Sequence, residues 1–504
     1  MAPDTEKITG KDRTLEDVVR TSVVDRGMLA KRRRWVKIPL LVIVVLAVVV
    51  FAFFRQVSAI SVPEDLATDE EHFKYGSIGS DTLEGNGVPY WLWRALPRVC
   101  SDKLPPGGLA SVGVIQEPGM DRPIGFSKRR TGFFDSVGLN CASCHTASVR
   151  EAVNSQPRIY LAAASHQLDL WAYFNFLFEC GASPTFTVDR VMAEIASMTT
   201  LSPVEKIIYR IAIKQTPAKL AGQAAVLSWI KERPLWGPGR VDTFNPYRSL
   251  LFHVPVPAKS IGTADFMTIW SQEARSGLFV HWDGNNPSVA ERNISAALGA
   301  GATPATLDMP RLDRIRKWLW DVRPPAYPFA VDYQLAAAGK PVYERECAYC
   351  HDAGGKDFGN VTTNQHIGTD PYRSDAFDAD MSGLMNRIGE GYPWRFRNFR
   401  PTGGYANHPI DGAWLRAPFL HNGSVPTMRD LLNPGPERPK KFYKGFDLYD
   451  QKNLGFVSTQ ASSGGRQFFA FDTSEPGNGN LGHEYGTTLT PQQKDALLEY
   501  LKTY

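Results

Sequence analysis

Two five-residue motifs in this sequence place cysteine and histidine at the spacing that attaches haem. Residues 141–145 are CASCH and residues 347–351 are CAYCH, and together they use four of the six cysteines. In Cys-x-x-Cys-His the two thiols add to the vinyl groups of haem and the histidine binds the iron. We therefore predict two covalent haem c groups, attached and ligated by these residues: Cys141, Cys144 and His145 for the first, and Cys347, Cys350 and His351 for the second.

Two other chemistries use a Cys-x-x-Cys pair. A structural zinc site needs four ligands, usually two cysteine pairs close together, and these motifs are some two hundred residues apart. A redox dithiol belongs in a βαβ context and does not require the histidine that follows each pair here. The repeated histidine therefore favours haem at both motifs.

The function depends on the second axial ligand of each iron, because two strong protein ligands suit electron transfer and an open side can bind O2 or peroxide. His483 in GNLGHEYGTTL and His421 in RAPFLHNGSVP compete as second ligand of the C-terminal haem. Taken singly, each is more often a hydrogen-bonded structural histidine. Near the first motif only His166 and His253 merit attention, and we expect neither to bind iron. This asymmetry suggests one closed haem and one open haem.

The remaining cysteines, Cys100 and Cys180, have no neighbouring histidine or cysteine. In an oxidising compartment they could form a disulfide across the first haem unit. Two buried free thiols are the alternative, and the sequence leaves both open.

Composition and charge indicate a folded protein of two or three domains. Of 504 residues, 43% are hydrophobic and 21% are charged. Residues 1–37 hold ten Lys/Arg against six Asp/Glu, so the rest of the chain has 46 of each sign. A nucleic-acid-binding protein would carry its basic excess on the folded body, so we exclude nucleic acid as a partner.

Residues 38–54, IPLLVIVVLAVVVFAFF, contain no charged or polar side chain. Seventeen residues are at the short end of what crosses a hydrocarbon core of about 30 Å. A buried core helix and a cleaved signal peptide are alternatives, but the basic flank argues against the first and the length against the second. We expect an uncleaved signal anchor, which implies a single-pass protein of the bacterial inner membrane with its body in the periplasm.

Composition shifts along the chain suggest the following organisation: a cytoplasmic basic tail at 1–37, an anchor at 38–54, an acidic tether at 55–75, an N-terminal haem domain at 76–328 and a C-terminal haem domain at 329–504. The proline-rich RPPAYPF at 323–329 marks the domain boundary.

Helical patterns cover 165–179, 187–198, 202–214 and 217–232 in the first domain, where Ser202, Pro203 and Glu205 form a helix start. We expect further helices at 311–321, in DYQLAAAGKPVYERECAYCH before the second motif, and in the last fifteen residues. The fold class predicted is mainly α with much loop: two cytochrome c-like haem domains after a single N-terminal transmembrane helix.

Phrases throughout the body resemble the di-haem cytochrome c peroxidase superfamily, and within it the rubber-oxygenase-like branch. They are FKYGSIG (73–79), GVPYWLWRALPRV (87–99), RPIGFS (122–127), VGLNCASCH (137–145), GPGRVDTFNPY (237–247), HWDGNN (281–286), LRAPFLHNGSVPTMRDLLNP (415–434) and GHEYGT (482–487).

The resemblance implies a reactive N-terminal haem on His145 and a C-terminal electron-transfer haem with two histidine ligands, His351 and, by best match, His483. It also implies an aromatic residue between the haems, for which Trp270 and Trp282 are the candidates, each equally well explained as a packed core tryptophan. The superfamily often binds calcium between its domains, but no acidic cluster here indicates where.

Three functions remain open at this stage. In the first, the N-terminal haem activates O2 for addition across a carbon–carbon double bond, and a helical region at 162–232 supplies an apolar pocket. In the second, it reduces hydrogen peroxide with electrons from a small donor cytochrome, and Glu151 is available as distal acid/base. In the third, the protein only carries electrons. A membrane tether argues against extracellular polyisoprene, so we expect a small or lipid-like substrate, and the phrases above favour the first function.

Overall fold

The structure, a computed structural model, describes residues 41–53, 55 and 61–504, and it divides into two units, Met1–Ile60 and Ser61–Tyr504. In the first unit, residues 41–53 form a helix with exposed side chains. The predicted basic tail lies outside the described residues, as do residues 38–40 and 54 of the predicted anchor and 56–60 of the tether.

The prediction of a membrane anchor is wrong. Within the ranges that the structure describes, no helix is both long enough and apolar enough to cross a bilayer. The single-pass inner-membrane localisation, with its periplasmic body, rested on that anchor and is overturned with it.

The predicted fold class, mainly α after a transmembrane helix, is also wrong. Helices take 40% of the described residues and strands take 13%. The strands are two to six residues long and antiparallel, and most form isolated pairs. Such short strands carry too little alternation of apolar and polar residues to be recognised in a sequence.

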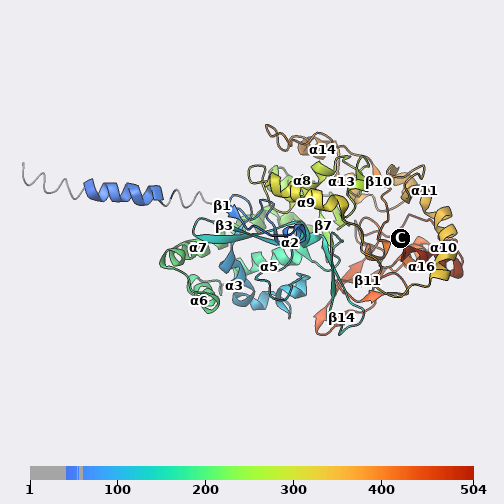
Figure 1. Cartoon of the computed structure of the whole chain (residues 1–504), viewed down its shortest axis with the longest axis horizontal. Helices are drawn as coiled ribbons and strands as arrows, with labels where there is room; N and C mark the ends of the chain where they lie inside the picture. The colour runs from blue at the N-terminus through green and yellow to red at the C-terminus, as the bar shows by residue number, and fades with distance from the viewer. Residues whose placement is uncertain (1–40, 54, 56–60) are drawn as a thin grey trace, which may run out of the picture. The chain divides into compact units, whose positions relative to one another are not determined.

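One four-stranded antiparallel sheet precedes the first haem motif and positions it (Figure 1). Its strands, in the spatial order β1-β3-β4-β2, are β1 (Ser61–Pro63), β2 (Val88–Pro89), β3 (Phe126–Thr131) and β4 (Phe134–Leu139). The β3–β4 hairpin turns at Gly132, whose φ of 57° suits glycine. Phe126 and Val137 face a buried core, and β4 ends two residues before Cys141.

The helices of the first half of the body were predicted only in part. They are α2 (Asp69–Tyr75), α3 (Tyr90–Val99), α5 (Leu170–Ala182), α6 (Val188–Met198) and α7 (Pro203–Val226). The helices α5, α6 and α7 lie where helical patterns were expected, whereas α2 lies in the predicted tether and α3 in a segment with no predicted helix. The predicted start at Ser202 is confirmed, because its side chain and that of Glu205 form a capping box. In the core between these helices and the sheet, the indole of Trp93 donates a hydrogen bond to Tyr173 at 3.0 Å.

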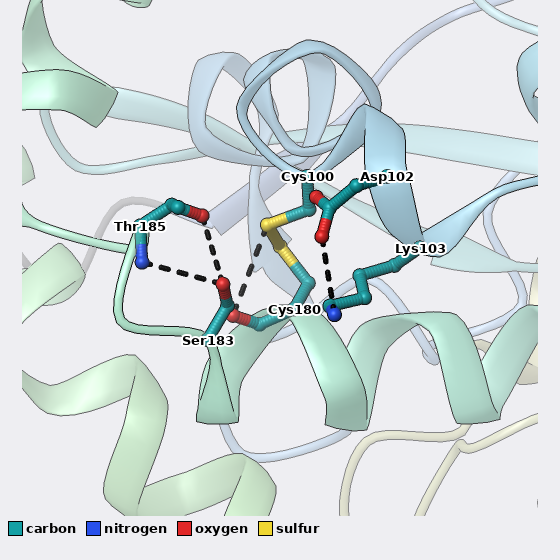
Figure 2. The surroundings of a disulfide bond; sticks show 6 residues. All are labelled: Cys100, Asp102, Lys103, Cys180, Ser183 and Thr185. Atoms are coloured by element: carbon teal, nitrogen blue, oxygen red, sulfur yellow. Dashed lines mark hydrogen bonds and ion pairs between the residues drawn. A yellow bond between two sulfur atoms is a disulfide. The ribbon is translucent and has the colours of Figure 1, made fainter.

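A disulfide joins Cys100, at the C-terminal end of α3, to Cys180 in α5 (Figure 2). Their Cα atoms are 5.5 Å apart, and both side chains are fully buried. Of the two alternatives left open by the sequence, the structure therefore shows the cross-link between helices rather than two free thiols.

The middle of the chain alternates short strand pairs with two helices. Its elements are β5 (Thr146–Val149), β6 (Arg158–Leu161), β7 (Arg240–Asp242), β8 (Thr263–Asp265), α8 (Val289–Gly299) and α9 (Met309–Asp321). β5 pairs with β6, and β7 pairs with β8. The helix predicted at 311–321 is confirmed and starts two residues earlier, where Asp308 caps it.

The second motif follows a helix that packs against the C-terminal helix of the chain. α10 (Tyr333–Glu346) and α16 (Pro491–Leu501) pack side by side, as Figure 1 shows, and α11 (Ala348–His351) follows α10 directly. At their closest approach Gly339 leaves room for the Ala496 carbonyl, which a Cβ atom would meet at 1.9 Å. Both helices were predicted.

The other C-terminal elements are short. They are α12 (Asn364–Ile367), α13 (Tyr372–Ala376), α14 (Ala379–Met385), α15 (Met428–Leu431), β9 (Val361–Thr363), β10 (Gly404–Ala406), β11 (Lys441–Lys444), β12 (Tyr449–Asp450), β13 (Gly455–Phe456), β14 (Ser462–Ser463), β15 (Arg466–Gln467) and β16 (Phe469–Asp472).

The largest core runs through both halves of the body. It joins Ala142 and Trp270 from the first half to Tyr343, Trp414 and Leu497 from the second. The division into haem domains at residue 329 stays a prediction, and residues 61–504 form one compact unit.

Candidate haem sites

The first motif begins where β4 ends, and a buried asparagine sets its position. Asn140 accepts a hydrogen bond from the Ala142 amide at 3.0 Å and so caps α4 (Cys141–Cys144). Its amide nitrogen donates to the carbonyls of Lys74 and Gly76. Because Cys141 and Cys144 are three residues apart in a helix, their thiols lie on one face, as attachment to one haem requires.

His145 is oriented by a main-chain carbonyl from a distant loop. Its Nδ1 donates to the Met267 oxygen at 2.8 Å, which leaves Nε2 available to a metal. Burial, together with the charge of Arg292, lowers the pKa of His145 to about 3, although the bond to Met267 opposes the change. The imidazole is therefore neutral, which is the form that binds iron.

The second motif uses the same arrangement. His351 Nδ1 donates to the His408 carbonyl at 2.7 Å. Burial lowers the pKa of His351 below its ordinary value, although the bond to His408 opposes this change. None of the four motif cysteines takes part in a disulfide in the described residues, and burial raises the pKa of each.

His483 lies opposite His351, and the separation of the two rings fits two ligands of one iron. Their centroids are 6.3 Å apart. An imidazole nitrogen binds a transition metal at about 2 Å, so two rings on opposite sides of one ion have centroids about 6 Å apart. The competing His421 instead stacks on Tyr405 and bonds to its hydroxyl at 3.0 Å, as a structural histidine does.

The loop that carries His483 is held by Arg438, a fully buried arginine that sequence reasoning missed. Its guanidinium donates to the carbonyls of Leu431, Asn433, Asn480, Gly482 and His483. The backbone of His483 has a φ of 49°, and its amide donates to the Ile367 carbonyl at 2.8 Å. These bonds keep the histidine in a conformation that non-glycine residues rarely adopt.

The two candidate tryptophans differ in their environment. Trp282 donates its indole N–H to the Asp265 carbonyl at 2.8 Å. Trp270 is fully buried, and its indole nitrogen has no hydrogen-bond partner among the residues that the structure describes. The Arg416 guanidinium lies 5.6 Å from its ring centre. Neither arrangement by itself assigns a role.

Trp282 is part of a chain of hydrogen bonds that connects the two proximal histidines. The chain starts at the bond from His145 to Met267 and continues along the backbone to Asp265, which accepts from Trp282. The neighbouring His281 carbonyl accepts from His408 Nε2 at 2.8 Å, and the His408 carbonyl accepts from His351. His408 was not predicted, because no local pattern marks it.

The other predicted residues near the first motif lie elsewhere. His166 is buried against Phe456, with ring centroids 3.5 Å apart, and within the described part of the chain neither ring nitrogen has a hydrogen-bond partner. His253 and Glu151 are exposed. We find no second imidazole stacked against His145 in residues 61–504.

An apolar cavity borders α4. Its walls include Val114, Ile124, Phe126, Leu168 and Tyr173, and it reaches Ala142 and Ser143. The predicted helical region 162–232 therefore contributes only in part to the apolar lining. Calcium stays a prediction without a site, because the described residues contain no group of three or more His, Cys, Asp or Glu that could hold a metal ion.

One protein-family model matches a segment in the C-terminal half of the chain. Residues 404–444 match a family model described as RoxA-like, cytochrome c-like. This segment includes His408, Arg438 and the phrase at 415–434 on which the resemblance partly rested. The match supports the cytochrome c, rubber-oxygenase-like resemblance, implies covalently bound haem c and fits a haem c oxidoreductase. The wider peroxidase superfamily stays a prediction.

Two relatives come from Sinorhizobium fredii (strain NBRC 101917 / NGR234). The chain is 29% identical over 279 residues to the uncharacterized protein y4iM, an alignment that covers 47% of this chain and 64% of the relative. It is 26% identical over 508 residues to the uncharacterized protein y4iJ, with 79% and 82% covered. The chain thus spans less than two thirds of y4iM, and neither name supplies an activity.

Proposed function

We propose that this chain is a di-haem c oxidoreductase whose two motifs have different tasks. His351 and His483 would hold the iron of the second haem, which would supply one-electron transfer. His145 would hold the iron of the first haem, the described residues offering no second imidazole, and that haem would bind O2 or, as the alternative, hydrogen peroxide. The match to a cytochrome c-like family supports the haem chemistry, and the division of tasks is our inference.

The observation that carries this proposal is the difference between the proximal histidines. His351 has a second imidazole at a centroid distance of 6.3 Å. His145 has a matching carbonyl partner, Met267, but no second imidazole stacks on it in the described body. An iron with two imidazole ligands exchanges electrons, whereas one with a free side binds small molecules.

Haem c, when bound, supplies one-electron chemistry and an iron coordination position for O2. The residues of the chain keep both imidazoles neutral and fixed in orientation through the Met267 and His408 carbonyls. The buried Trp270 and the partly buried Trp282 limit the access of water to the region between the motifs. Trp282 also lies on the hydrogen-bonded connection between them.

We favour O2 over peroxide because Glu151, the predicted distal acid/base, lies on the surface rather than in a buried site beside the first motif. Peroxide reduction needs a proton donor near the iron, and Glu151 is exposed. Addition of both oxygen atoms of O2 across a carbon–carbon double bond needs no external reductant. The cavity beside α4 is apolar but only about 10 Å³ in volume, so its lining fits an uncharged substrate while its size leaves room for little more than a water molecule.

The test is a carbon monoxide titration of the fully reduced protein, followed in the Soret band, together with the haem content per chain. We expect two haems and one CO per chain for the parent, and two CO for His483→Ala. The parent would then be offered O2 with an unsaturated fatty acid, or peroxide with a reduced cytochrome, to choose between the enzymes. If the parent binds no CO, both irons keep two protein ligands and the protein is an electron carrier.

A further inference from the structure

The longest helix in the described part of the chain, α7, buries only one of its sides. It runs over 24 residues and packs against α5 and α6 (Figure 1). Tyr209 and Ile213 are buried in the core of the first half, and Leu220 packs closely on Gly181 of α5. These side chains account for the packing of α7 on the rest of the body.

The opposite side of α7 exposes two isoleucines. Ile207 is 61% exposed and Ile211 is 53% exposed. Each precedes a buried residue, Tyr209 or Ile213, by two positions, and two positions correspond to about 200° around an α-helix. The isoleucines therefore point away from the core. Small exposed side chains continue this side toward the C-terminal end of the helix: Ala218, Ala221 and Ala225.

Basic side chains lie beside the exposed isoleucines. The helix contains four basic residues and one acidic residue. Lys206, Arg210 and Lys214 recur every four residues, so they form one row along the helix, next to Ile207 and Ile211. All three basic residues are exposed. The outer side of α7 is thus both apolar and positively charged.

Few negative charges offset this basic row. The carboxylate of Glu205, the acidic residue of α7, accepts a hydrogen bond from the main chain at the start of the helix, at 2.8 Å. Asp189 of α6 pairs with Arg210 at 3.2 Å. Within residues 61–504, Lys206 and Lys214 form no ion pair. The charges of these two lysines therefore remain unmatched beside the isoleucines.

We define the outer face of α7 as Lys206, Ile207, Arg210, Ile211 and Lys214, and its chemistry restricts what can cover it. A second copy of the chain, related by a two-fold axis, would bring the same basic row against itself, and like charges repel. A nucleic acid would pair with the lysines through its phosphates but would leave the isoleucines without an apolar partner. An anionic lipid surface satisfies both parts, because isoleucine enters the acyl boundary while lysine stays at the headgroups.

We propose that the outer face of α7 docks the body on an anionic lipid surface, with the helix lying parallel to that surface. The contact is peripheral, because it uses a helix of the folded body and needs no membrane-spanning segment. This inference goes beyond the proposed di-haem function and does not depend on it, since no residue of either motif takes part.

Sedimentation with lipid vesicles tests the proposal in the full-length protein. The probes are vesicles of phosphatidylcholine alone and of phosphatidylcholine with phosphatidylglycerol, at low and at high salt. We expect binding to the anionic vesicles that weakens as the salt concentration rises, because salt screens the lysines. Ile207→Gln/Ile211→Gln and Lys206→Gln/Lys214→Gln should each weaken this binding by at least about tenfold. Glutamine is a good helix former, so both double variants should keep α7 intact, which circular dichroism checks.

Matched controls separate this face from apolar surface and positive charge in general. Val153→Gln/Tyr333→Gln removes two side chains outside α7 that are 46% and 75% exposed. Lys317→Gln/Lys340→Gln removes two exposed lysines from α9 and α10. Neither control should weaken vesicle binding appreciably. Hydrogen–deuterium exchange of the α7 peptides should slow on anionic vesicles in the parent and in both controls, which distinguishes this contact from binding through another segment.

Four results would overturn the proposal. Vesicle binding that is equal in the parent and in both α7 variants would show that another part of the chain makes the contact. An equal loss in Lys317→Gln/Lys340→Gln would show attraction by net charge alone. A parent that forms dimers, which Ile207→Gln/Ile211→Gln abolishes, would show that a second copy covers the face. A parent that binds no anionic vesicles would refute the lipid surface and favour an acidic protein as the partner.

Discussion

Arg438 donates a hydrogen bond to the main-chain oxygen of His483 at 3.3 Å, and it donates to the preceding Gly482 oxygen at 2.7 Å. The arginine is fully buried and binds the loop through carbonyl groups, with the Glu484 carboxylate 4.0 Å away. Because His483 is held in a left-handed backbone conformation, its ring position depends on these bonds rather than on regular secondary structure.

We expect Arg438→Lys to release His483 from the second iron. A lysine ammonium can replace only some of the five hydrogen bonds, and each lost bond weakens the loop by about 1 kcal/mol. The reduced variant should then bind between one and two CO per chain in the Soret titration. His483→Ala sets the upper limit of two.

The far-ultraviolet circular dichroism of Arg438→Lys must match that of the parent, so that global unfolding does not mimic loop release. A well-folded variant that still binds one CO per chain, while His483→Ala binds two, would show that the loop holds its shape without Arg438. One CO per chain in both variants would instead refute the assignment of His483 as a ligand of the second iron.

Trp282→Phe should slow electron transfer between the haems. The substitution keeps an aromatic ring but removes the N–H that bonds to the Asp265 carbonyl, so the hydrogen-bonded connection from His145 to His351 is interrupted. The rate can be measured after flash photolysis of CO from the half-reduced protein. Trp270→Phe is the matched comparison, because the Trp270 nitrogen has no partner to lose. A larger decrease in the rate from Trp270→Phe than from Trp282→Phe would show that Trp270, and not Trp282, lies on the path of the electron.

Structural features that depend on residues close together in the sequence could be predicted. The Cys-x-x-Cys-His motifs, the cap at Ser202 and the helix before the second motif all depend on neighbours within five residues. The structure brings His483 rather than His421 to His351, as the resemblance implied. Its role as a ligand stays a prediction until it is tested.

Features made by distant residues could not be predicted. The carbonyl partner of His145 is 122 residues away and that of His351 is 57 residues away, and any residue type could supply a carbonyl. The buried Arg438 carries no local signal either. Its contacts with the His483 loop form only when the fold brings distant segments together.

Pro217 misled the helix prediction, which placed two helices at 202–214 and 217–232. The structure has one helix, α7, that continues through the proline. A proline inside a helix costs about 3 kcal/mol. Packing on both sides offsets that cost, because Tyr209 and Ile213 are buried before it and Leu220 packs closely on Gly181 of α5 after it.

The buried pair of Asp265 and Lys444, 3.0 Å apart, should make stability depend on pH. Burial raises the pKa of Asp265 to about 6 from its ordinary 3.8, although Lys444 opposes the shift. A raised folded pKa means that the folded protein binds this proton more tightly. Its contribution to stability is complete below about pH 4 and is lost as the pH rises through about 6.

Denaturant unfolding of the parent and of Asp265→Asn at pH 4, 5, 6 and 7 measures this effect, since other titrating groups cancel in the difference. We expect the parent to lose up to about 3 kcal/mol relative to the variant over this range. In Lys444→Met the window should move to higher pH, because the cation that favours the ionised carboxylate is gone. A constant difference between parent and Asp265→Asn would contradict the raised pKa.

The disulfide between Cys100 and Cys180 should supply a large part of the stability of the first half of the body. It closes a loop with a sequence separation of 80, and the chain-entropy model assigns such a loop about 4 kcal/mol. Cys100→Ala/Cys180→Ala should therefore lower the free energy of unfolding by roughly that amount, since the longer the loop, the more the cross-link restricts the unfolded chain.

Treatment with a reductant should lower the free energy of unfolding of the parent to a similar value and leave that of the double variant unchanged. The haem-motif cysteines provide no alternative target, because a thioether bond to haem is not reduced by thiols. If the reduced parent and the double variant both unfold at the denaturant concentration of the oxidised parent, then the packing of α3 on α5, rather than the cross-link, holds these helices together.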